Sequence, residues 1–180
     1  MSERLDDLYL ARAREDVGLL QKLMEYFPGY KGYRNKEMLR ETDRRVRETI
    51  YERLIEVLNI LKQALRHLVF ADLEAAKNMD RIITRVEGLA EKVRHAEYGY
   101  QPFMSHIRIG KKQLRAMLRY DANIALNLSA LMESALNLRM EAKKKQDVVG
   151  AASEFESLID VLERTLARRK EYMIISGGVK

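Results

Sequence analysis

Tyrosine, glycine and basic residues gather in two short segments of this 180-residue chain. The first segment reads PGYKGYRN at 28–35, and the second reads EYGYQPFMSHIRIG at 97–110. Lysine and arginine bind carboxylates and phosphates, and tyrosine offers a rigid contact surface with one polar hydroxyl group. These residue types together can hold an anionic partner.

The net charge of +6 follows the same two segments. Residues 28–66 contain ten basic and six acidic residues, residues 98–120 contain five basic and no acidic residues, and the last sixty residues are neutral. Lysines at the start of a helix oppose the helix dipole, so helix stability does not explain them. We therefore predict an anion-binding surface. Its candidate residues are Tyr30, Lys31, Tyr33, Arg34, Lys36, Arg40, Tyr98, Tyr100, His106, Arg108, Lys111, Lys112 and Arg115.

Two other interpretations of these segments stay open. In the first, the Gly-Tyr loops only turn the chain, the tyrosines pack over the open end of a bundle, and the lysines are solvated. In the second, tyrosine and arginine stack on the bases of RNA or single-stranded DNA. No RNP, KH, OB or helix-turn-helix signature supports nucleic-acid binding.

The remaining polar residues favour no enzyme and no cofactor. A di-metal centre in a four-helix bundle needs Glu-x-x-His on two helices. This chain has Glu91-x-x-x-His95 instead. We therefore place a metal-dependent enzyme third, behind the two binding functions, and expect no metal. The chain contains no P-loop, Rossmann or nucleophile-elbow motif. Asp43 and Asp121 lie in otherwise helical runs, and we interpret each as a partner in an ion pair rather than as a catalyst.

The elements that must position these residues are helices. Apolar residues recur in steps of three and four, glycine and proline are scarce, and both prolines fall in the two Gly-Tyr segments. Asp72 and Asp147 are suitable N-caps. An a/d seam from Met79 to Ala96 is typical of antiparallel helix pairs and coiled coils. We expect helices over residues 2–27, 35–68, 72–96, 111–141 and 147–173.

Short loops make neighbouring helices antiparallel, which predicts an all-α, single-domain bundle of about five helices built on a long, coiled-coil-like hairpin. Both Gly-Tyr segments then lie at the same end of the bundle. The expected divisions are an N-terminal amphipathic helix at 1–27, the hairpin at 28–97, a loop at 98–110, a second hairpin at 111–173 and a frayed tail at 174–180.

Composition sets the expected environment and partners. Cysteine is absent, no charge-free apolar stretch is long enough to span a membrane, and the first residues do not resemble a signal peptide. We expect a cytoplasmic protein. The polar face of the first helix is acidic, which disfavours binding to a membrane surface. The expected partner is a protein or a second copy of this chain, and nucleic acid is the alternative.

The run FPGYKGYRNKEMLRETDRRVRE, followed after the hairpin by HAEYGYQPF, resembles an uncharacterised family of prokaryotic all-helical proteins. The resemblance covers residues 27 to 172, and it rests on a Gly-Tyr-x-Gly-Tyr loop at Gly29–Tyr33 and a later Tyr-Gly-Tyr loop. This chain is more basic after the second loop than that family is. The resemblance implies the helical fold and no activity.

Overall fold

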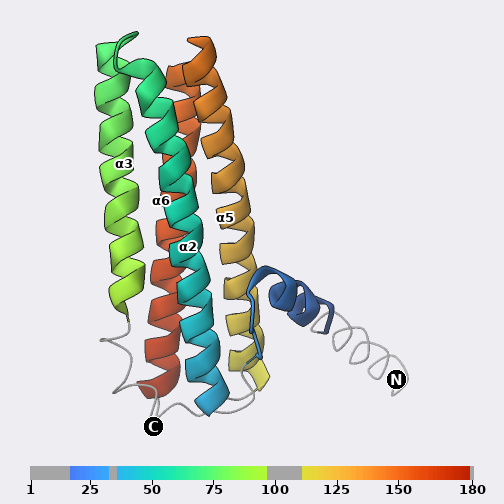
Figure 1. Ribbon diagram of the computed structural model, residues 1–180. Coiled ribbons are helices and arrows are strands. Elements are labelled where there is room, and N and C mark those ends of the chain that lie inside the picture. The colour runs from blue at the N-terminus through green and yellow to red at the C-terminus, as the bar shows by residue number, and fades with distance from the viewer. Residues whose placement is uncertain (1–16, 33–35, 97–110, 179–180) are drawn as a thin grey trace, which may run out of the picture.

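The computed structural model describes residues 17–32, 36–96 and 111–178. Four long helices stand side by side, α2 (Lys36–Leu68), α3 (Leu73–Arg94), α5 (Lys111–Lys144) and α6 (Val148–Gly178) (Figure 1). A shorter helical stretch covers residues 17–26 and packs beside α2 and α5. The predicted all-α antiparallel bundle is confirmed.

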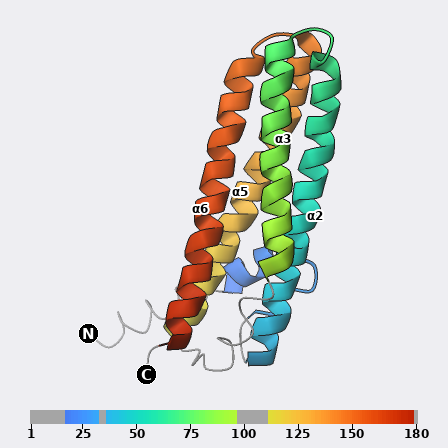
Figure 2. The same ribbon diagram turned by 90° about the vertical axis from the view of Figure 1, so that its left-hand side faces the viewer.

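The bundle closes around one apolar core. Helix α2 packs against α3 on one side and α5 on the other, and α6 packs along α5. The contact between α3 and α6 is much less extensive than these three. The turns from α2 to α3 and from α5 to α6 lie together at one end, which we call the turn end. The opposite end holds the first turns of α2 and α5 and the last turns of α3 and α6 (Figures 1 and 2).

Local sequence signals explain where the helices begin. The Asp72 carboxylate accepts a hydrogen bond from the Ala75 amide at 3.0 Å, so it caps α3 as predicted. At the start of α6, the Asp147 carboxylate accepts a hydrogen bond from the Gly150 amide at 3.0 Å. The predicted seam is buried from Met79 to Val93, because these apolar side chains fall on the face of α3 toward the bundle, and Ala96 after the helix is half-buried.

Some predicted boundaries were wrong. Helix α5 ends at Lys144 and α6 at Gly178, whereas the sequence suggested ends near 141 and 173 and a frayed tail from 174. Leucine, isoleucine and tyrosine continue the last turns of α6, and the Tyr172 ring packs on the Tyr120 ring of α5 at 5.6 Å. Gly177 and Gly178 are the last two residues of α6, and glycine is common at helix C-termini. Residues 1–16 lie outside the described part.

Candidate functional site

A network of buried polar side chains ties the first Gly-Tyr loop to the bundle. The Tyr30 hydroxyl donates to Asp121 Oδ2 of α5 at 2.7 Å, and Arg169 Nε of α6 donates to Asp121 Oδ1 at 2.7 Å. All three residues are at most 4% exposed. A buried carboxylate is costly unless it is paired, and Asp121 has both a cation and a hydroxyl group against it.

The same network continues from α6 to α2. The Arg169 guanidinium also donates to Asp43 Oδ1 at 2.6 Å, and Arg47 Nε donates to Asp43 Oδ2 at 2.9 Å. Two aspartates thus face two arginines, and the set is neutral overall. Asp43 and Asp121 are ion-pair partners, as the sequence analysis expected. Their pairing leaves neither carboxylate in the position of an isolated acid or base.

Glycine lets the loop reach this network. Gly29 and Gly32 have φ angles of 79° and 75°, which side chains with a Cβ rarely adopt. The Thr42 hydroxyl of α2 donates to the Gly32 carbonyl at 2.7 Å and fixes the loop against the helix. The Tyr30 ring stacks on the Phe27 ring with centroids 6.0 Å apart. The two glycines therefore direct Tyr30 inward.

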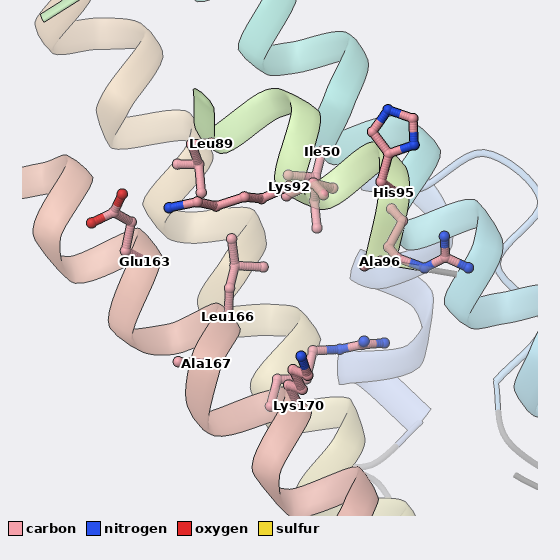
Figure 3. A pocket seen from close by; sticks show the side chains of 12 residues that line it. Ile50, Leu89, Lys92, His95, Ala96, Glu163, Leu166, Ala167 and Lys170 are labelled. Carbon is pink, nitrogen blue, oxygen red and sulfur yellow. The ribbon is translucent and has the colours of Figure 1, made fainter. Parts of the chain in front are cut away.

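Next to the network, a cleft of about 590 Å³ opens between α2, α3 and α6. Half of its twelve lining residues are apolar, and five of the others carry a charge. Lys92 reaches from α3 toward Glu163 on α6, and Leu89 and Leu166 face the same space (Figure 3). The Arg47 and Arg169 side chains form part of its wall. The cleft thus combines apolar walls with basic side chains.

Ion pairs hold α3 and α6 together beside the cleft, toward the turn end. Arg81 contacts Glu156 at 3.2 Å, and Arg85 contacts Asp160 and, at 2.8 Å, Glu163. The hydrogen bonds that Arg85 donates to Asp160 and Glu163 raise the pKa of Arg85, and the Arg85 guanidinium lowers the pKa of Asp160. Beyond Glu163 the two helices separate, and the gap between their ribbons is visible in Figure 2. The cleft begins where these ion pairs end.

The structure removes Tyr30 from the predicted docking surface. It is 1% exposed, and its hydroxyl group donates a hydrogen bond to Asp121. Tyr30 therefore fits the interpretation in which the loop tyrosines pack against the bundle. Lys31 is exposed and pairs with Glu41 at 3.0 Å. Arg40 is exposed, and Arg115 is half-buried.

The side chains of the other candidate residues lie outside the described part of the chain. Lys36 begins α2, and Lys111 and Lys112 begin α5 at the same end of the bundle, but their side chains lie outside the described part. The rest of the predicted surface also lies outside the described residues: Tyr33, Arg34, Tyr98, Tyr100, His106 and Arg108.

The sequence analysis missed the basic residues that α6 brings to this end. Residues 163–171 contain four basic and two acidic residues, including the run Arg168–Lys170. The signal was present, because an up-down bundle places the end of its last helix beside the start of its first. The net charge of the last sixty residues is zero, because the acidic start of α6 offsets its basic end. That sum conceals the basic residues near the end of the helix.

We define the basic end as residues 36–53, 87–96, 111–128 and 163–178. These ranges hold sixteen basic and ten acidic residues. The remaining helix lengths and turns, residues 54–86 and 129–162, hold nine basic and ten acidic residues. Positive charge is therefore concentrated at one end of the long axis of the bundle.

The described residues offer no metal site, since no three histidine, aspartate or glutamate side chains among them are grouped to hold an ion. His95 pairs instead with Glu91 of the preceding turn at 3.1 Å. Within the same residues, every helix is too short or too polar to cross a membrane.

Comparisons with family models, curated proteins and solved structures find no match to this chain. The resemblance to a prokaryotic helical family therefore stays a prediction.

Proposed function

We propose that this protein is a non-enzymatic helical binding protein that docks an acidic protein surface at its basic end. The observation that carries the proposal is the separation of charge along the bundle, sixteen basic against ten acidic residues at one end and nine against ten in the rest. Two of those ten acidic residues, Asp43 and Asp121, are buried. Arg47 and Arg169, which pair with them, leave the count as well, so fourteen basic and eight acidic residues remain at the basic end.

A protein fits this surface better than a nucleic acid does. Acidic side chains are interleaved with the cations: Arg44 contacts Glu48 at 2.8 Å, and Arg45 contacts the same glutamate at 3.2 Å. A phosphate backbone carries one sign of charge along its length, so these carboxylates would repel it. A protein surface can place its own basic groups opposite them. Two basic ends would repel each other, so self-association would need another surface.

The test compares two variants that each lose three positive charges. The first changes Arg40, Arg119 and Arg168 to alanine at the basic end, and the matched control changes Arg66, Lys77 and Lys143 to alanine in the rest of the bundle. All six residues are exposed. Binding of a labelled glutamate-rich peptide, a labelled RNA and a labelled single-stranded DNA is measured by fluorescence anisotropy at 50 and 200 mM salt.

We expect the first variant to bind the peptide about tenfold more weakly than the wild type, because each surface charge contributes a fraction of a kcal/mol to association. The control variant should bind like the wild type. Equal losses in both variants, or no peptide binding at 50 mM salt, would overturn the proposal. RNA or DNA binding that is tighter than peptide binding and falls steeply with salt would favour the nucleic-acid function instead.

A further inference from the structure

We propose that the cleft between α2, α3 and α6 binds a small amphiphilic monoanion, an apolar chain of medium length that ends in a carboxylate. This inference goes beyond docking at the basic end, since the cleft walls are distinct from the exposed arginines used there. A volume of about 590 Å³ lies within the range of small-molecule sites.

The apolar part of the ligand follows from the walls of the cleft. Ile50, Leu89 and Val93 are buried core residues whose remaining surface faces the cleft, and Leu166 and Ala167 line it from α6. In a bundle closed along its whole length these side chains would pack against a facing helix. An apolar chain lying along them would remove their surface from water.

The charged part follows from the balance of charges around the cleft. Four basic residues line it, Arg47, Lys92, Arg169 and Lys170, and one acidic residue, Glu163. Behind the wall, Asp43 and Asp121 are paired with the two arginines. Lys92 adds an exposed ammonium group to this wall, and one ammonium group matches a single carboxylate. A dianionic phosphate would leave an excess negative charge in a site with apolar walls.

Lys92 and Ala167 allow a test that spares the core, because both are exposed. Lys92→Ala removes one ammonium group from the site, and Lys77→Ala removes one from the same helix outside it. Ala167→Phe fills the cleft with an aromatic ring without deleting a buried contact. The basic-end variant of Arg40, Arg119 and Arg168 leaves the cleft lining unchanged, so it separates this proposal from the previous one.

The probes are decanoate, decanol, butyrate and decyl phosphate, and calorimetry of the full chain gives their dissociation constants. We expect decanoate to bind the wild type at least about tenfold more tightly than each of the other three, because only decanoate combines the chain with one negative charge. Lys92→Ala should weaken decanoate several-fold and leave decanol unchanged. Ala167→Phe should abolish binding, whereas Lys77→Ala and the basic-end variant should bind decanoate like the wild type.

Each opposite result would overturn the proposal. Undetectable decanoate binding to the wild type would do so, as would equal affinity for decanol, which would show that the charge is not recognised. Tighter binding of decyl phosphate would contradict the monoanion. Decanoate binding unaffected by Ala167→Phe in a variant with a wild-type circular dichroism spectrum would place the ligand elsewhere. None of these results would change the outcome of the peptide experiment.

Discussion

At the scale of single residues, Tyr30 shows how one hydroxyl group links a surface loop to the interior. Its ring packs on Phe27, and its hydroxyl group donates a hydrogen bond to the buried carboxylate of Asp121, to which Arg169 also donates. An aromatic residue with a polar tip is suited to this position, because the ring fills apolar space while the hydroxyl group satisfies a buried acceptor.

Replacing Tyr30 by phenylalanine should therefore destabilise the protein. The substitution keeps the ring and deprives Asp121 Oδ2 of its hydroxyl donor, which costs about 1–3 kcal/mol for a buried acceptor. Urea unfolding followed by circular dichroism measures the loss. The control is Tyr51→Phe, whose hydroxyl group has only a 3.5 Å contact with the exposed Arg94. A loss no larger than that of the control would show that the bond to Asp121 contributes nothing.

At the scale of elements, the start of α6 depends on a pairing between neighbouring residues. A Cβ added at Gly150 would clash with the Asp147 carboxylate, which caps the helix. By contrast, a Cβ added at Gly88 in the middle of α3 would meet nothing within 4 Å. An added methyl group is therefore accommodated at Gly88 and obstructed at Gly150.

The two glycine-to-alanine substitutions should accordingly have opposite effects on stability. Gly88→Ala should stabilise the protein by about 0.5–1 kcal/mol, because alanine loses less backbone entropy in a helix. Gly150→Ala should destabilise it by about 0.5–2 kcal/mol, because the cap must be displaced. Thermal and urea unfolding of both variants provide the measurement. Stabilisation by Gly150→Ala would show that Asp147 is not needed as a cap.

At the scale of the whole molecule, the charge distribution should reduce stability. Cations concentrated at one end of the bundle repel one another, and salt screens that repulsion. Residues kept for binding often impose such a cost. Measuring how the basic end affects the free energy of unfolding therefore tests whether its cations serve binding, and it requires no partner.

Changing Arg40, Arg119 and Arg168 to alanine should raise the free energy of unfolding at low salt by a few tenths of a kcal/mol. The gain should shrink in 0.5 M salt, where the Debye length is only a few ångströms. The change of Arg66, Lys77 and Lys143 to alanine should bring no such gain. Urea unfolding at 20 mM and 0.5 M salt tests this, and a loss of stability in the basic-end variant would show that its cations help hold the fold.

The sequence by itself determined that the chain forms long helices, that Asp72 and Asp147 cap two of them, and that the helices pack as an all-α antiparallel bundle. These properties depend on periodicity, on contacts three or four residues apart and on composition, all of which can be read along the chain. The interpretation of Asp121 as an ion-pair partner succeeded for a similar reason, since a carboxylate in an apolar helical run needs a cation.

Only the tertiary structure decided which residues meet. The Tyr30 and Asp121 side chains bond across 91 positions, and those of Arg169 and Asp43 across 126. The sequence analysis placed Tyr30 on the surface and overlooked Arg169, because burial depends on how four helices pack. The cleft likewise exists because α3 and α6 separate beyond Glu163, and no local pattern in either helix encodes the spacing between them.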